Sequence, residues 1–217
     1  MPDHQIVYRG GVGEIVEKKS RFIATVIPIC SEEEALAFIE QQKKQYWDAP
    51  HNCSAYTLGL HHELARCSDD GEPAKTAGRP MLDVLLAEDI HNVCVVVTRY
   101  FGGTLLGTGG LVRAYQAATK AGLEQSLIIT KRLGIPVTID TDYTGVGKLQ
   151  YIVAQMDLVI QETLYTDAVR MTVLTPEDAC QAFQKKVTEA TSGKAVLTVQ
   201  DPIWFGDANG ELVYFSV

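Results

Sequence analysis

The amino-acid sequence predicts an α+β protein of two domains, covering residues 1–131 and 132–217. A chain of 217 residues is long for one compact domain and suits two, because domains typically hold about 100 to 150 residues. The second half reads as βαββαβ, the order of the ferredoxin-like split. The first half surrounds a nearly continuous apolar run, residues 92–98, which we expect to be a central strand covered on both faces.

The first domain is expected to open with strands and one well-signalled helix. Residues 6–29 alternate as strands do, and a further strand is expected at 53–59. Between them, Ser31 and Glu34 form a capping box that begins a helix, which ends before Pro50. The tip of the early strands is basic and consists of Lys18, Lys19 and Arg21.

A loop and a second helix precede the apolar run. Residues 68–80, SDDGEPAKTAGRP, are rich in turn formers and are expected to lie at the surface. Pro80 suits the first turn of the helix that follows, whose Met81, Leu82 and Leu85 should point inward.

A glycine-rich loop after the run leads into a helix expected from Leu111. Five glycines fall within nine residues: Gly102, Gly103, Gly107, Gly109 and Gly110. Glycine serves where φ is positive or another group comes close, so this loop is suited to backbone contact. No acidic residue occurs between Asp89 and Glu124. Three cations in this stretch therefore have no acidic residue near them in the sequence: Arg99, Arg113 and Lys120.

Beyond an expected boundary at 131–136, the second domain has clear element signals. The expected strands are 136–141, 159–165, 168–174 and 195–200, and the expected helices are 145–156 and 176–190. Thr175 is predicted to cap the second helix, with Pro176 at its first position. Asn209-Gly210 predicts a hairpin that adds a strand to one of the sheets.

Composition and charge limit the function classes. Hydrophobic residues make up 46% and charged residues 21%, as in globular proteins, and no apolar run approaches the about 20 residues of a membrane span. We expect a cytoplasmic protein with no membrane contact and with five reduced cysteines. The net charge is −8, so any contact with nucleic acid must be local. The first domain has a net charge of −3 and the second one of −5, so the first is better suited to bind an anionic partner.

The glycine loop has two interpretations. A strand, glycines and a helix N-terminus resemble a phosphate cradle, because free N–H groups and the helix dipole favour an anion. Alternatively, the glycines only let the helix pack close to the sheet. The P-loop pattern and the dinucleotide fingerprint are both absent, which argues against a nucleotide cofactor.

Three acids in the surface loop, Asp69, Asp70 and Glu72, have a structural and a metal interpretation. Clustered carboxylates can bind Mg²⁺, but such acids more often cap turns and pair with an arginine. We favour the structural role, with Arg79 or Arg99 as the partner. Whether the loop holds a metal is left open.

Two other kinds of chemistry are weakly indicated. A zinc site would have to draw on His51, Cys53, His61, His62 and Cys67, whose spacing matches no standard zinc motif. A nucleophile is not favoured, since Cys53 and Cys94 lie in strand patterns and Ser68 lacks an elbow motif.

Five motifs together resemble the IMPACT/YigZ family. They are KKSRFIA at 18–24, HNCSAY at 51–56, SDDGEP at 68–73, TAGRP at 76–80 and VTRYFGGTLLGTGGLVRAY at 97–115. The resemblance implies a first domain with the fold shared by elongation factor G domain IV and a small-subunit ribosomal protein domain. It also implies a ferredoxin-like second domain. Lys75 departs from the glycine usual in the family, which bears on the conformation of that loop.

The resemblance further implies translational control in eukaryotic members and nucleic-acid or ribosome association in bacterial ones. Our first hypothesis is therefore a non-enzymatic translation-associated regulator that binds RNA or the ribosome. The residues expected to do so are Lys18, Lys19, Arg21, Arg79, Arg99, Gly102, Gly103, Gly107, Gly109, Gly110, Arg113 and Lys120.

Two alternatives stay open. One is an enzyme acting on a phosphorylated or nucleic-acid substrate, with a metal held by Asp69, Asp70 or Glu72. The other is a protein-interaction module, with a translation-related protein as partner, that binds through the acidic second domain. No cofactor is expected in the first hypothesis.

Overall fold

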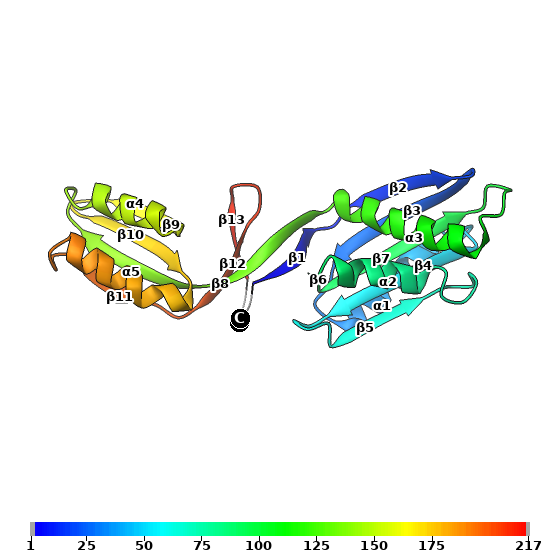
Figure 1. Cartoon of the computed structure of the whole chain (residues 1–217), viewed down its shortest axis with the longest axis horizontal. Coiled ribbons are helices and arrows are strands. Elements are labelled where there is room, and N and C mark those ends of the chain that lie inside the picture. The colour runs from blue at the N-terminus through cyan, green and yellow to red at the C-terminus, as the bar shows by residue number, and fades with distance from the viewer. Residues whose placement is uncertain (1–2, 216–217) are drawn as a thin grey trace. The chain divides into compact units, whose positions relative to one another are not determined.

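The computed structural model of the protein describes residues 3–215 (Figure 1). It contains two compact units. His4–Thr130 forms one, and the chain from Lys131 onward, with Asp3, forms the other. Both units mix helices with antiparallel sheet, as the α+β prediction required.

The unit formed by His4–Thr130 is built on a five-stranded antiparallel sheet. Its strands, in spatial order, are β2 (Val12–Glu17), β3 (Ser20–Pro28), β7 (Val93–Tyr100), β4 (His51–Leu58) and β5 (Leu64–Ser68). Outside this sheet, β1 (His4–Arg9) pairs in parallel with β6 (Ile90–His91). The helices are α1 (Glu32–Gln45), α2 (Gly78–Ala87) and α3 (Gly107–Glu124).

Strand β7 explains the apolar run in the sequence. Figure 1 shows α2 and α3 lying over one face of the sheet, and Val93, Val95 and Val97 pack in the same core as these helices. Cys94 and Val96 point the other way, into the core beneath α1. The central strand covered on both faces is thus confirmed, although its neighbours are antiparallel.

Helix α1 starts as its capping box predicts. Ser31 Oγ accepts a hydrogen bond from Glu34 N at 3.3 Å. The Glu34 carboxylate accepts from Cys30 N at 2.7 Å, so it reaches the residue before the cap.

The second unit has the strand order of a ferredoxin-like domain. Its elements are the part of β8 (Leu127–Thr141) from Lys131 onward, α4 (Val146–Gln155), β9 (Val159–Tyr165), β10 (Val169–Thr175), α5 (Glu177–Ala190) and β11 (Val196–Val199). The strands lie in the order β11-β8-β10-β9, all antiparallel. Apolar residues of α4 and α5, including Leu149 and Phe183, cover one face of this sheet.

Three local predictions need comment. The hairpin at Asn209-Gly210 is confirmed, because β12 (Ile203–Asp207) and β13 (Leu212–Phe215) pair across it and β12 extends the pairing to β8. The cap at Thr175 was wrong, since its hydroxyl donates to Ile135 O and Pro176 occupies the cap position. Residues 131–136, the expected boundary, lie inside the continuous strand β8.

Candidate nucleic-acid interface and its buried support

The basic tip is a two-residue turn between β2 and β3. Glu17 pairs with Ser20 across the hairpin, and the two lysines between them have φ of 46° and 66°. Positive φ at both central residues is the geometry of the type I′ turn, which suits the twist of paired strands. Lys18 and Lys19 are both exposed, so the turn presents two ammonium groups to solvent.

The glycine loop lies directly against this turn. Gly102 N donates to Ser20 Oγ at 3.1 Å, and a Cβ at Gly102 would lie 2.0 Å from the Lys19 carbonyl carbon. Gly103 and Gly107 have positive φ, and no atom lies within 4 Å of the position that a Cβ would take at either residue. Gly102 therefore allows close packing against the turn, whereas Gly103 and Gly107 leave their backbone open to solvent.

Helix α3 begins earlier than the sequence suggested. It starts at Gly107 instead of Leu111, so Gly109 and Gly110 form its first turn. That turn has no acidic residue and no side-chain cap. Free N–H groups at the end of an 18-residue helix favour a negatively charged group.

Arg113 lies one turn further along α3 and lines the same hollow as Lys18. This hollow of about 260 Å³ is also lined by the acidic Glu17, by Gly110 and by apolar side chains that include Leu106 and Ala114. We refer to Lys18, Lys19, Gly103, Gly107 and Arg113 as the turn–loop surface.

The remaining exposed cations of the predicted set each have an acidic partner. Arg21 makes two hydrogen bonds to Glu14, at 2.7 and 2.8 Å, and these hold the pKa of the Glu14 carboxyl below its usual value. Arg79 pairs with Asp83 at 2.7 Å, one turn along α2. Lys120 lies 3.9 Å from Glu88, in a different hollow from the one that Lys18 and Arg113 line.

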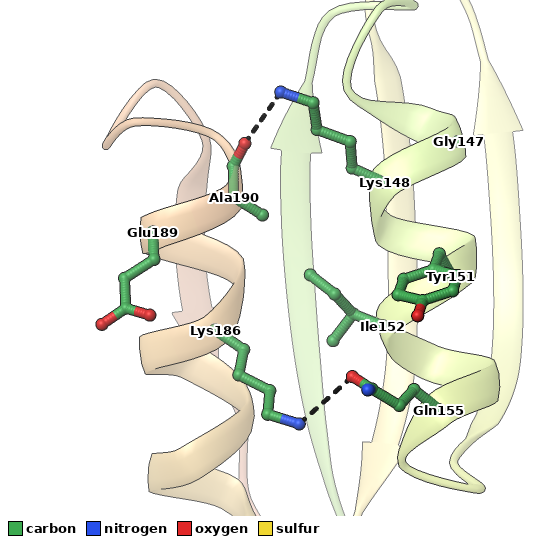
Figure 2. Close-up of a pocket in the computed structure, with 8 residues that line it drawn as sticks. All are labelled: Gly147, Lys148, Tyr151, Ile152, Gln155, Lys186, Glu189 and Ala190. Atoms are coloured by element: carbon green, nitrogen blue, oxygen red, sulfur yellow. Dashed lines mark hydrogen bonds between the residues drawn. The ribbon is translucent and has the colours of Figure 1, made fainter.

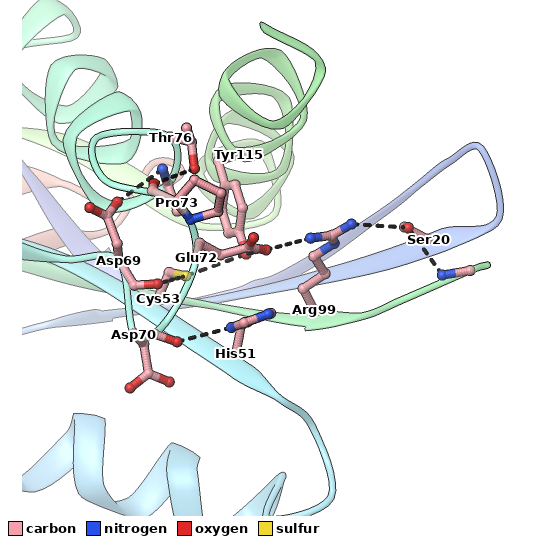
Figure 3. A network of polar contacts seen from close by, with 12 residues as sticks. Ser20, His51, Cys53, Asp69, Asp70, Glu72, Pro73, Thr76, Arg99 and Tyr115 are labelled. Atoms are coloured by element: carbon pink, nitrogen blue, oxygen red, sulfur yellow. Dashed lines mark hydrogen bonds and ion pairs between the residues drawn. The ribbon is translucent and has the colours of Figure 1, made fainter. Parts of the chain in front are cut away.

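Arg99 is buried behind this surface, in the polar network of Figure 3. Its guanidinium donates to Glu72 Oε1 at 2.6 Å, and Tyr115 Oη donates to the same oxygen at 2.8 Å. A second nitrogen of Arg99 lies 3.5 Å from Ser20 Oγ, which also binds Gly102 N. The network thus connects the acidic loop, the helix α3 and the turn that carries the lysines.

The acids of the surface loop are used internally, as the structural interpretation predicted. Asp69 accepts from Lys75 N, Ala77 N and Gly78 N at 2.8 to 3.1 Å, which fixes the start of α2. Asp70 accepts from Asn52 N at 2.7 Å and pairs with Lys43 at 3.0 Å. Of the two arginines considered for this loop, Arg99 is the one that pairs, through Glu72. Lys75, the departure from the family pattern, has a positive φ of 63°.

The buried thiols are unsuited to nucleophilic chemistry. Cys53 Sγ lies 3.0 Å from Asp69 O and 3.3 Å from Tyr115 Oη. Burial raises the pKa of Cys53 well above its usual value and that of Cys94 to about 12. Both therefore stay protonated near neutral pH, and a thiol is a much weaker nucleophile than a thiolate.

A third hollow lies in the other unit, between α4 and α5 (Figure 2). It has a volume of about 660 Å³. Lys148 donates to Ala190 O at 3.0 Å and Lys186 to Gln155 Oε1 at 3.4 Å, so two hydrogen bonds cross from one helix to the other. Between them, Tyr151 is 68% exposed.

Sequence reasoning missed Ser20 and Tyr115, the two hydroxyls that join the network to the surface. Both residues lie inside motifs of the family, Ser20 in KKSRFIA and Tyr115 in VTRYFGGTLLGTGGLVRAY, but neither motif shows what the hydroxyl contacts. Their partners lie 43 to 82 residues away along the chain, and no local pattern indicates such contacts. Within residues 3–215, no helix has the length and apolar character needed to cross a membrane.

Comparison with known proteins gives matches to both units. Residues 18–123 match the family model described as the Impact N-terminal domain, and residues 139–194 match a domain of unknown function, DUF1949. The IMPACT family member YvyE of Bacillus subtilis is 40% identical over 189 residues, which cover 87% of each chain.

Two solved structures are also similar. A crystal structure of a hypothetical protein has 32% sequence identity and a TM-score of 0.58, and the alignment covers 93% of this chain and 98% of that one. Yih1, described as a two-domain translational regulator, is 28% identical over 55% of this chain and 48% of its own, with a TM-score of 0.37.

Proposed function

The chain belongs to the IMPACT family. We propose that it is a translation-associated regulator without catalytic activity, and that it binds RNA, either free or in the ribosome. The contact is the turn–loop surface, and the protein acts in the cytoplasm. Translational control is what the resemblance implies for eukaryotic members of the family.

One observation supports the contact above all others. In an acidic chain, Lys18 and Arg113 border one hollow beside the uncapped N-terminus of α3. Cations and free backbone N–H groups together bind the phosphates of a nucleic-acid backbone. Because phosphates carry no sequence information, the contact gives affinity with little sequence preference.

The predicted set of contact residues is narrowed in this proposal. Arg99 supports the surface without contacting RNA. It is buried against Glu72, and it holds the acidic loop and Ser20 in place behind the surface. Arg21, Arg79 and Lys120 have acidic partners and contribute less net positive charge.

The metal-dependent alternative has less support. Asp69, Asp70 and Glu72 hydrogen-bond backbone N–H groups, a lysine, an arginine and a tyrosine. Within residues 3–215, the acidic loop is not among the groups that bring three ligand atoms close together. An ion there would have to displace contacts that hold the fold.

We expect the double variant Lys18→Ala/Arg113→Ala to bind a fluorescein-labelled RNA duplex about tenfold more weakly than the unaltered protein at low salt. Each phosphate contact releases counterions, so the slope of log affinity against log salt should also fall by about two. Fluorescence anisotropy across a KCl series measures both quantities, and co-sedimentation with purified ribosomes repeats the comparison.

The matched control is Lys44→Ala/Lys185→Ala, which removes the same charge from two exposed lysines outside the surface. It should bind RNA as the unaltered protein does. Equal loss in the two double variants would show that net charge alone governs binding and would refute the surface. Arg99 is kept unchanged because its removal would unpair the buried Glu72.

The α4–α5 hollow favours a second candidate, protein interaction through the acidic second unit. Tyrosine is enriched in the cores of protein interfaces. Tyr151 is exposed in this chain and lines the hollow. Pull-down from nuclease-treated lysate with Tyr151→Glu and with the Lys18/Arg113 variant separates the two. Protein partners lost only with Tyr151→Glu would favour this candidate.

A further inference from the structure

Two histidines and one aspartate meet at the start of β6, away from the turn–loop surface. His62 lies in the turn between β4 and β5, and Asp89 and His91 flank the start of β6. His62 Nε2 is 3.1 Å and His91 Nε2 is 3.2 Å from the same oxygen, Asp89 Oδ1. Among residues 3–215, these three form the one group of histidine, cysteine or acidic side chains whose ligand atoms all lie within 4.8 Å of one another.

The hydrogen bond on the far side of His91 fixes which nitrogen faces Asp89 without a proton. His91 Nδ1 lies 3.1 Å from the carbonyl oxygen of Gly59, which can only accept, so Nδ1 carries the hydrogen. In the neutral ring, Nε2 then presents a lone pair to a carboxylate oxygen. Two acceptors at this distance require a proton or a cation between them. A backbone carbonyl behind a histidine is also the usual outer contact of a metal ligand.

The second histidine brings another imidazole nitrogen to the same carboxylate oxygen. The His62 and His91 rings stack with centroids 4.2 Å apart, so both imidazoles lie on one side of Asp89 Oδ1. His62 Nδ1 is buried without a hydrogen-bond partner within residues 3–215. Asp89 is 75% exposed, so an ion held by these atoms would keep one side open to water.

The distances fit a small transition-metal ion. Zinc binds histidine nitrogen and carboxylate oxygen at about 2.0 to 2.1 Å, and the edge of a tetrahedron of that size is about 3.3 Å. The two separations of 3.1 and 3.2 Å are close to this edge. The stacked rings are nearly parallel, at 8°, so His62 must tilt for both lone pairs to converge. Its position in a turn makes that tilt a local change.

We propose that His62, Asp89 and His91 form a binding site for a divalent transition-metal ion, with Zn²⁺ as the best match to two imidazoles and a carboxylate. Water completes the coordination on the exposed side. The ion links the β4–β5 turn to the start of β6, and this link stabilises that edge of the folded unit.

The test is calorimetric titration of the full chain, freed of metal by a chelator, with ZnCl₂. We expect one ion per chain in the unaltered protein. Asp89→Asn and His62→Gln should each weaken binding by about tenfold or more, since loss of an outer contact alone costs that much. Zn²⁺ should also raise the thermal unfolding midpoint of the unaltered protein and not of Asp89→Asn.

The matched control is His61→Gln, which removes the exposed histidine next to the site and should leave binding unchanged. Cys30 and Cys67 are exposed thiols, and cysteine thiolates are zinc ligands, so these two side chains compete with the site in a titration. Titration with Co²⁺ distinguishes them, because thiolate ligands add an intense near-ultraviolet charge-transfer band. No binding to the unaltered protein, equal affinity in all variants, or that thiolate band would each overturn the proposal.

Discussion

Replacing Glu72 by glutamine is expected to lower the free energy of unfolding by about 3 to 5 kcal/mol. Glu72 and Arg99 are buried, with side chains 3% and 7% exposed, and lie 2.6 Å apart. Glutamine keeps the shape of the side chain but leaves the arginine charge buried without a counter-charge. Removing one partner of a buried pair is far more costly than the pair itself is worth, because the remaining charge has lost its water.

A second substitution tests whether the cost arises from the unpaired charge. Adding Arg99→Met to Glu72→Gln removes that charge and leaves an apolar chain beside Phe22 and Phe101, over which the guanidinium lies. The double variant should recover most of the lost stability. Urea unfolding followed by circular dichroism gives all four free energies and hence the coupling between the two residues.

The exposed pair between Arg79 and Asp83 is the control. Its atoms are 2.7 Å apart, but both side chains are about half exposed. Asp83→Asn should cost less than about 1 kcal/mol, as exposed ion pairs do. Similar costs for Glu72→Gln and Asp83→Asn would contradict the role assigned to burial.

The same buried pair shows what the sequence could and could not predict. Clustered acids in a turn-rich loop predicted a structural role with Arg79 or Arg99 as partner. Choosing between them requires the fold, because Glu72 and Arg99 are 27 residues apart and meet only when the loop folds over β7. By contrast, Asp83 follows Arg79 by four residues in a helix, so that pair is readable from the sequence.

Elements with strong local signals were predicted well. The apolar run of β7, the capping box of α1 and the βαββαβ order depend on periodicity and near neighbours, and the structure agrees with each. The start of α3 was misjudged because glycine disfavours helix, and here the first turn consists largely of glycines. Thr175 was misjudged because a tertiary contact with Ile135 takes its hydroxyl.

The basic surface that we propose is smaller than the one predicted from the sequence, for a physical reason. Listing cations along the chain cannot show which have acidic neighbours in space. Glu14 reaches Arg21 across a hairpin, and Glu88 approaches Lys120 from the end of α2. What the fold adds is the selection of Lys18 and Arg113, which border one hollow although 95 residues separate them.

The second large effect is expected for Gly102→Ala, which should destabilise the protein by about 1 to 3 kcal/mol and weaken RNA binding. The new Cβ would lie 2.0 to 2.3 Å from backbone atoms of Lys19 and Ser20. Backbone atoms cannot turn aside as a flexible side chain does, so the loop must move away from the turn. The hydrogen bond from Gly102 N to Ser20 Oγ, at 3.1 Å, would then be lost.

The same exchange at Gly147 serves as the control. Gly147 lies in α4, has nothing within 4 Å of the missing side chain, and does not need positive φ. Alanine there should stabilise the protein by up to about 1 kcal/mol, since it favours helix over glycine. Opposite signs at the two positions, in urea unfolding, would separate close packing from the general effect of added side-chain volume.

RNA binding by Gly102→Ala tests the link between the loop and the lysine turn. The measurement is anisotropy with the same RNA duplex, at a temperature where the variant is fully folded by circular dichroism. If the loop positions Lys18 relative to Arg113, affinity falls in the folded variant, because the two cations no longer border one hollow. Unchanged affinity with reduced stability would mean that Gly102 serves packing alone and that the cations bind RNA independently of the loop.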